Sequence, residues 1–128
     1  MSATSSVIEF VLSSSINTFP EKVLSEGRRC VTDGIGVILA GSTEECAHIV
    51  QEQIAAQGGT EEATIFGLSG ARAPASLAAR ANGTAGHAMD FDDTQLSNLP
   101  DRIFGLLTHP TVAPLSACLL YTSDAADE

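Results

Sequence analysis

The residues best suited to chemistry in this sequence lie between residues 82 and 110. The stretch from Asn82 to Thr94 reads Asn-Gly-Thr-Ala-Gly-His-Ala-Met-Asp-Phe-Asp-Asp-Thr, and a His-Pro pair follows at residues 109 and 110. Three carboxylates, two histidines and a hydroxyl are gathered here: Asp90, Asp92, Asp93, His87, His109 and Thr94. Carboxyl and imidazole groups are the commonest acids and bases of enzymes, so this gathering indicates proton-transfer chemistry.

The spacing of the aspartates predicts which of them act together. On a helix or its frayed end, Asp90, Asp93 and Thr94 share one face because residues three and four apart are neighbours, while Asp92 points elsewhere. Carboxylates that close disfavour each other's ionisation, which suits one of them to carry a proton near neutral pH. One of these carboxyl groups is therefore a candidate acid or base. The alternative is that these aspartates are helix caps and solvated turn residues, which spacing alone does not exclude.

The two histidines receive different predictions. His109 precedes a proline at the start of a helix, where a histidine can simply cap the turn, but an imidazole beside a carboxylate is the commonest acid-base pair. His109 is therefore a candidate partner for one of the aspartates, with the cap as the alternative. His87 lies among small residues on its own helix, and we expect it to have a supporting role, packed or hydrogen-bonded to an aspartate. Asn82 and Gly83 are expected to be structural, at a site of close backbone approach.

Two other chemistries fit the aspartates less well. Asp90-x-Asp92-x-Thr94 matches the pattern of haloacid-dehalogenase-type phosphohydrolases, in which the first aspartate is the nucleophile and Mg²⁺ bridges it to phosphate. That site needs a buried strand directly before it, and the preceding Gly-Thr-Ala-Gly-His-Ala-Met is poor strand material. Paired aspartates can also hold Mg²⁺ by themselves, but without a phosphate cradle they give little support for a metal site. We predict no metal and no cofactor.

Length and charge limit the partners of the chain. It has 128 residues, enough for one domain, and its net charge of -10 makes nucleic acid and anionic membranes poor partners. No stretch reaches the roughly 20 apolar residues of a membrane span, and the N-terminus does not resemble a signal peptide. We therefore expect a soluble cytoplasmic protein. Cys30, Cys46 and Cys118 are far apart and lack metal-binding spacing, so we expect reduced thiols in the core.

The elements around the chemical residues are predicted to form an all-α fold with at most one short β segment near residues 63–67. Apolar residues recur at helical spacing from Val23 to Leu39, in a helix that Gly41 ends. Gly27 and Gly34 on its apolar face each cost about 1 kcal/mol relative to alanine, which implies close approach of another helix. Further helices are expected at residues 7–14, 43–57, 72–89 and from 112 onward.

Local signals predict where these helices start and what they pack against. Ser42 to Glu45 fits a capping box. The helix at residues 7–14 is amphipathic and is expected to pack on the helix that follows it. Pro114 cannot lie deep inside a helix, so the last helix is expected to begin near Val112. The apolar Ile103 to Leu107 are expected to pack under the domain.

Three segments of the chain carry a resemblance to a known family. They are Arg-Arg-Cys-Val-Thr-Asp-Gly-Ile-Gly-Val-Ile-Leu-Ala-Gly at residues 28–41, the signature Asn-Gly...His-Ala-x-Asp-Phe-Asp-Asp-Thr within residues 81–94, and His109-Pro110. With these segments the chain resembles the MmgE/PrpD family, whose members include 2-methylcitrate dehydratases, cis-aconitate decarboxylases and iminodisuccinate epimerases. The resemblance runs from about Val7 to Cys118.

The resemblance implies a helical N-terminal domain, completed by a later α/β lid domain and usually part of a homodimer. It implies acid-base chemistry on small polycarboxylates without metal or redox cofactor: dehydration as in 2-methylcitrate dehydratases, decarboxylation or epimerisation. Position by position, the resemblance implies that Asp90 and His109 are catalytic residues. It implies that Thr94 and Asp93 belong to the substrate-binding site, where Thr94 contacts the substrate and Asp93 supports the site. The loop between Thr94 and His109 is longer than in the best-known decarboxylases, which leaves the substrate open.

The resemblance also predicts a fragment. Family members are several times longer, so residues 1–118 are expected to be part of the helical domain, and residues 119–128, which depart from the family pattern, to be a non-native or truncated tail. Without the lysines and histidines of the later region, the chain is expected to be inactive alone. The alternative is a stand-alone helical interaction module whose acidic cluster is only surface and caps.

Overall fold

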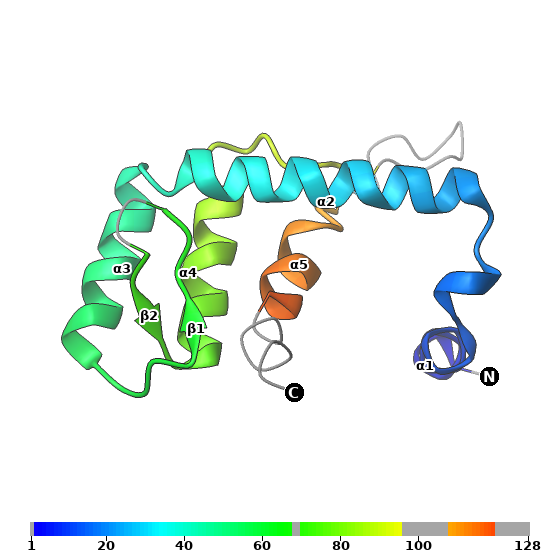
Figure 1. Cartoon of the computed structure of the whole chain (residues 1–128), viewed down its shortest axis with the longest axis horizontal. Coiled ribbons are helices and arrows are strands. Elements are labelled where there is room, and N and C mark those ends of the chain that lie inside the picture. Colours follow the sequence, from blue (N-terminus) through cyan, green and yellow to red (C-terminus); the bar gives the residue numbers. More distant parts are fainter. Residues whose placement is uncertain (1, 68–69, 96–107, 120–128) are drawn as a thin grey trace.

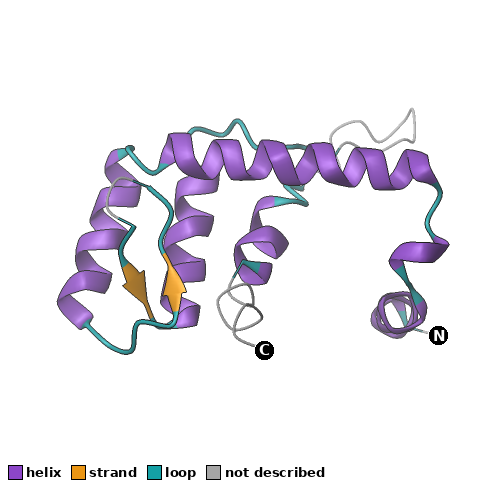
Figure 2. Cartoon of the chain, in the orientation of Figure 1, coloured by secondary structure: helices purple, strands orange, loops and turns teal. Residues whose placement is uncertain are grey.

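The computed structural model describes residues 2–67, 70–95 and 108–119 (Figure 1). Helices dominate this part of the chain, and one short antiparallel hairpin accompanies them (Figure 2). In order, the elements are helix α1 (Ala3–Ser13), the 3-10 turn η1 (Ile16–Thr18), helices α2 (Glu21–Gly41) and α3 (Glu45–Gln57), strands β1 (Ala63–Thr64) and β2 (Arg72–Ala73), and helices α4 (Ala75–His87) and α5 (Val112–Cys118). The predicted mainly α-helical fold with a short β segment is confirmed. None of the described helices is both long and apolar enough to cross a membrane.

Helix α2 is the long element on which the helices of the site pack. Figure 1 shows it lying across the ends of α4 and α5. Gly34 faces α5, where a Cβ would lie 2.6 Å from Leu115 Cδ2, and Gly41 faces α4, where a Cβ would overlap the carbonyl oxygen of Ala85. Because glycine has no Cβ, Gly34 and Gly41 allow α5 and α4 to approach α2 closely. The predicted close approach is confirmed at Gly34, whereas at Gly27 no described residue lies within 4 Å of a Cβ position.

An apolar cluster joins the hairpin to α3 and α4. It consists of Ile54, Ala63, Ile65, Ala73, Ala78 and Ala81. The hairpin register pairs Ala63 with Ala73 and Thr64 with Arg72. Strand β2 lies where the sequence predicted the start of a helix at Arg72, and α4 begins three residues later. The buried Asn82 of α4 secures the hairpin, because its side chain accepts a hydrogen bond from Phe66 N at 2.9 Å and donates one to the Thr64 carbonyl at 3.1 Å. The structural role predicted for Asn82 is confirmed.

The N-terminal part of the chain is much less buried than its apolar pattern predicts. Helix α1 has no buried residue, and its large apolar side chains are exposed: Val7, Ile8, Phe10, Val11 and Leu12. It lies away from the helices that carry the site, near the N-terminal end of α2 (Figure 1), and the rings of Phe10 and Phe19 are 6.3 Å apart. Val23 and Val31 are exposed because this half of α2 extends past α4 and α5. The predicted packing of α1 on α2 is therefore wrong within the described residues.

The cysteines are free thiols but are not core residues. Cys46 and Cys118 are exposed and Cys30 is only partly buried. Cys46 lies outside because Ala47 and Ile54 occupy the inward side of α3. These three residues form no disulfide in the described structure, and their predicted core location is wrong.

The start of α5 is brought back to the end of α4 by a backbone bridge. The N–H of Gln95 donates a hydrogen bond of 2.8 Å to the carbonyl of Thr108, so these two residues meet although they are distant in sequence. His109 therefore returns beside the aspartates, and α5 begins at Val112 as predicted. The packing predicted for Ile103 to Leu107 lies outside the described residues.

Candidate active site

The end of α4 sets the directions of the three aspartates. The helix ends at His87, and the N–H of Asp90 donates to the His87 carbonyl at 3.1 Å in the turn that follows. Asp90 has a φ of 55°, the left-handed conformation that commonly ends a helix and reverses the chain. The residues after it are not helical. The prediction that Asp90, Asp93 and Thr94 share one helical face, with Asp92 elsewhere, is therefore wrong.

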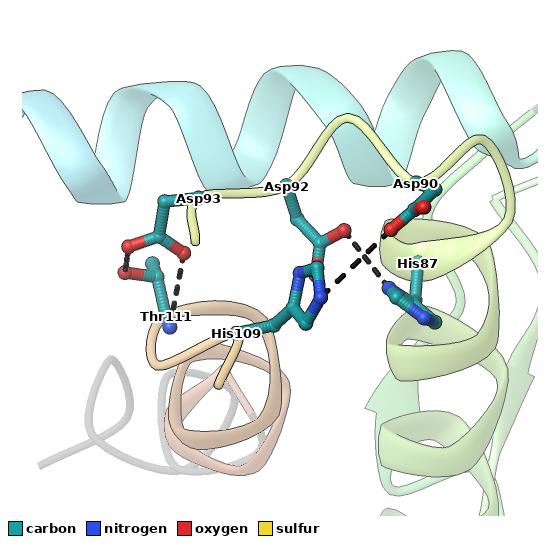
Figure 3. A network of polar contacts seen from close by, with 6 residues as sticks. All are labelled: His87, Asp90, Asp92, Asp93, His109 and Thr111. Carbon is teal, nitrogen blue, oxygen red and sulfur yellow. Dashed lines mark hydrogen bonds and ion pairs between the residues drawn. The ribbon is translucent and has the colours of Figure 1, made fainter. Parts of the chain in front are cut away.

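Asp92 is the carboxylate at the centre of the site. Its side chain is 1% exposed, whereas the preceding Phe91 points outward and is 75% exposed. Its Oδ1 lies 2.9 Å from His87 Nδ1, and its Oδ2 lies 3.2 Å from His109 Nδ1 (Figure 3). The contact with an aspartate that was predicted for His87 is confirmed, and its supporting role stays a prediction. Sequence reasoning missed Asp92 because it continued helical spacing past the end of α4 at His87.

His109 lies between two aspartates that face opposite edges of its ring. Its Nε2 is 3.8 Å from Asp90 Oδ1, and its Nδ1 faces Asp92 (Figure 3). Its ring meets that of His87 edge-on, with centroids 4.6 Å apart and 69° between the planes. The structure thus brings the predicted pair together, with Asp90 77% exposed and His109 31% exposed. A distance of 3.8 Å is too long for a hydrogen bond, so among the described residues both atoms remain open to a third group. Their catalytic role stays a prediction.

His87, Asp90, Asp92 and His109 form the His-Asp cluster, and Asp93 lies to one side of it (Figure 3). The carboxylate of Asp93 accepts hydrogen bonds from the Thr111 N–H at 3.2 Å and from the Thr111 hydroxyl at 2.6 Å (Figure 3). These bonds fix the aspartate segment to the N-terminal end of α5, where a carboxylate is favourable as acceptor and as charge. Asp93 therefore supports the site, and Thr94 is exposed beside it. Substrate contact by either residue remains a prediction.

Asp92 raises the pKa of His87 above its ordinary value. The largest cause is the hydrogen bond between the two side chains; the charges of Asp92 and Asp90 add to it, and desolvation partly opposes it. The side chain of His87 is 56% exposed, so solvent weakens this interaction. His87 consequently stays protonated to a higher pH than an isolated histidine.

We expect the stability of the fold to depend on this protonation. Because the pKa of His87 is raised in the folded state, its contribution is fully present below the unfolded pKa of about 6.5 and is lost as pH rises through the folded pKa. Above about pH 6.5, the free energy of unfolding should therefore fall more steeply in the wild type than in His87→Gln. Urea unfolding at a series of pH values measures this. Asp90, Asp92 and His109, which face His87, are the same in both proteins, so identical pH dependences would contradict the prediction.

A small pocket lies beside the cluster, between α4 and α5. Its volume is about 280 Å³. It is lined by Gly83, Val112 and Ala113 together with His87, Asp92 and His109. The pocket therefore has small apolar residues on one side and acid-base side chains on the other. Such a lining fits a small molecule that carries both apolar carbon atoms and charged groups.

The same side chains are also a possible donor set for a divalent cation. One ligand atom each from His87, Asp90, Asp92 and His109 lies within 4.8 Å of the others. These donors face one another in pairs, however, and Oδ1 of Asp92 is already hydrogen-bonded to His87. The phosphohydrolase alternative loses support, because the helix α4 rather than a buried strand precedes Asp90.

Comparison with known proteins identifies the family of the chain. Residues 5–101 match the MmgE/PrpD N-terminal domain. The chain belongs to the MmgE/PrpD family. The match includes the segment from Asp90 to Thr94 and ends before His109, so the place of His109 in the site rests on the geometry described above.

Two curated relatives in this family are cis-aconitate decarboxylases. The human protein (Homo sapiens) is 34% identical over 74 residues, which are 58% of this chain and 15% of the relative. The mouse protein (Mus musculus) is 30% identical over 93 residues, 73% of this chain and 19% of the relative. The chain therefore spans less than a fifth of the length of either relative. No solved structure shows a significant match to it.

Proposed function

We propose that the protein containing this chain is a cofactor-independent lyase or isomerase that acts on small polycarboxylates. The reaction is proton transfer at a carbon next to a carboxylate, followed by loss of water, loss of CO₂ or inversion. The similarity to cis-aconitate decarboxylases supports a lyase reaction within this set. In the proposal, Asp90 and His109 are the catalytic pair, Thr94 contacts the substrate and Asp93 supports the segment.

The observation that carries this proposal is the position of His109 between Asp90 and Asp92. A base must lie beside the carbon acid, and a second group must return or retain the proton. Asp90 Oδ1 and His109 Nε2 are 3.8 Å apart, and the Asp90 side chain is largely exposed. A substrate placed against this pair can therefore exchange a proton with either group.

The proposal requires positive charge from outside the described residues. Proton removal next to a carboxylate develops an anion, which needs cations or hydrogen-bond donors around it. Arg80, on α4, is hydrogen-bonded to Gln53, and Arg102 lies outside the described residues. Within the described part of the chain, no lysine or arginine contacts the His-Asp cluster. We therefore expect the rest of the protein to supply the anion-binding groups.

The exposed apolar side of α1 and α2 supports a larger assembly. The large apolar side chains of α1 are exposed. Next to them in the chain, a groove of about 760 Å³ is lined by residues of η1 and α2, including the apolar Ile16, Phe19, Val23 and Val31. Contiguous exposed apolar surface of this kind usually marks an interface. We propose that it is covered in the complete protein, which we expect to be a homodimer, as the family resemblance implies.

Turnover assays on the full-length protein test the proposed function. The protein encoded by the source gene is incubated with cis-aconitate, 2-methylcitrate or iminodisuccinate, with and without EDTA, and the products are separated by chromatography. We expect turnover of one of the three that EDTA does not reduce, and no turnover by the 128-residue chain alone. If the folded full-length protein converts none of them, the proposal is wrong.

A further inference from the structure

Asp92 joins two histidines through its two carboxylate oxygens. Oδ1 is 2.9 Å from His87 Nδ1, and Oδ2 is 3.2 Å from His109 Nδ1. The carboxylate is almost fully buried, while His87 is more than half exposed to solvent. A buried carboxylate needs donors on both oxygens, and in the described structure the two imidazoles are the groups placed to provide them.

The contact between Asp92 and His109 constrains the proton on His109. Oδ2 of Asp92 and Nδ1 of His109 are both buried, and neither has a hydrogen bond of standard geometry to any described group. They nevertheless face each other at 3.2 Å. If Nδ1 carried no proton, its lone pair would oppose those of a buried carboxylate with nothing to compensate. A proton on Nδ1 turns the same contact into a charge-assisted attraction.

We propose that Asp92 is a positioning residue that holds His109 as the tautomer protonated at Nδ1. The lone pair of Nε2 is then available on the other edge of the ring, where Asp90 lies. His87 donates to the second carboxylate oxygen and fixes the orientation of Asp92. The role of this arrangement in turnover rests on the proposed function, whereas the tautomer itself does not.

The arrangement has a direct consequence for the proton-transfer step. Nε2 of His109 accepts the proton from the substrate carbon, the C–H bond breaks, and its electron pair is delocalised into the adjacent carboxylate of the substrate. His109 becomes an imidazolium that is protonated on both nitrogens, and the negative charge of Asp92 stabilises it. Without that charge, Nε2 is a weaker base, and without the acceptor the favoured tautomer changes.

The tautomer is measured by nitrogen NMR of the full-length protein labelled with ¹⁵N-histidine. EDTA is present so that no divalent cation occupies the four donors, and the His109 signals are assigned by their loss in His109→Gln. In the wild type we expect the proton of neutral His109 on Nδ1. In Asp92→Asn we expect the tautomer protonated at Nε2 to become the major form, because the amide nitrogen of the substituted side chain can donate to Nδ1.

The matched control is His87→Gln. It removes the neighbouring imidazole but keeps Asp92 charged and leaves an amide donor for it, so His109 should remain protonated at Nδ1. A wild-type His109 protonated at Nε2, or an Asp92→Asn variant with an unchanged His109 tautomer, would overturn the proposal. The wild-type spectrum decides the question even if Asp92→Asn fails to fold.

Kinetics provide the second readout. We expect Asp92→Asn to lower kcat by about 100-fold or more, with KM changed less than about threefold, and to move the acidic limb of the kcat-pH profile to lower pH. A loss of activity without that displacement of the profile would indicate a purely structural role and contradict the proposal. If the full-length protein turns over none of the three substrates, the proposed function fails, while the NMR result still decides the tautomer.

Discussion

Replacing Asp90 by asparagine in the full-length protein is expected to lower kcat by about 10²- to 10⁴-fold. The substitution keeps the size of the side chain and removes the ability to take up or release a proton. It also suits the backbone, because asparagine tolerates the left-handed conformation that Asp90 adopts at a φ of 55°. The loss should therefore appear in turnover rather than in folding. Steady-state kinetics and thermal unfolding of the same preparations separate the two effects.

A double substitution sharpens this prediction. If Asp90 and His109 act as one unit, the variant with both Asp90→Asn and His109→Gln should be no more than about threefold slower than the slower single variant, because groups that act together are strongly non-additive. Glu52→Gln is the matched control, since Glu52 is an exposed carboxylate on α3 outside the site. Full activity of Asp90→Asn, or a Glu52→Gln variant that is equally impaired, would remove the proposed role of Asp90.

Periodicity predicted the helices of this fold better than it predicted their surroundings. The apolar spacing from Val23 to Leu39 correctly predicted α2, and Pro114 correctly predicted that α5 starts at Val112. Burial was predicted less well, because an apolar face shows that a partner is favourable but not which residues supply it. Val23 and Leu39 both belong to the predicted buried face, yet both are exposed in the described structure.

Local hydrogen-bond signals were also ambiguous. Ser42 and Glu45 fit a capping box, yet the residue at the N-cap of α3 is Glu44 and makes no side-chain cap. The hydroxyl of Ser42 instead donates to the Leu39 carbonyl at 2.7 Å, closing the end of α2. A serine between two helices can serve the end of the first or the start of the second, and the sequence does not distinguish them. Strand β2 was missed because each strand of the hairpin has only two residues, too few to show an alternating pattern in the sequence.

In the candidate site, residue types are easier to predict than directions. The chemistry of Asp90, His109 and His87 is apparent from their residue types, and the structure brings them together. Asp92 was predicted to point away from the site because helical spacing was continued past His87, where α4 ends. One left-handed residue, Asp90, turns the following segment so that Asp92 faces inward. Such a conformation is accessible to aspartate but not required by it, so the reversal is not apparent from sequence.

The packing of α4 against α2 provides the largest expected effect on stability. Gly41→Ala should lower the free energy of unfolding by about 3 kcal/mol, because the new Cβ would overlap the backbone carbonyl of Ala85, which cannot rotate away as a side chain can. Gly36→Ala is the matched control in the same helix. Gly36 is exposed, and nothing described lies within 4 Å of its Cβ position, so alanine should stabilise α2 by about 1 kcal/mol through helix propensity.

This pair of variants also tests whether the contact positions the site. Moving α4 away from α2 displaces His87, which lies at the end of α4 and is hydrogen-bonded to Asp92. Urea unfolding followed by circular dichroism gives the stabilities, and the ¹⁵N shifts of His87 report its hydrogen bond. We expect Gly41→Ala to change both and Gly36→Ala to leave the shifts as they are. If Gly41→Ala were as stable as Gly36→Ala, α2 and α4 would not be in the close contact that places His87 beside Asp92.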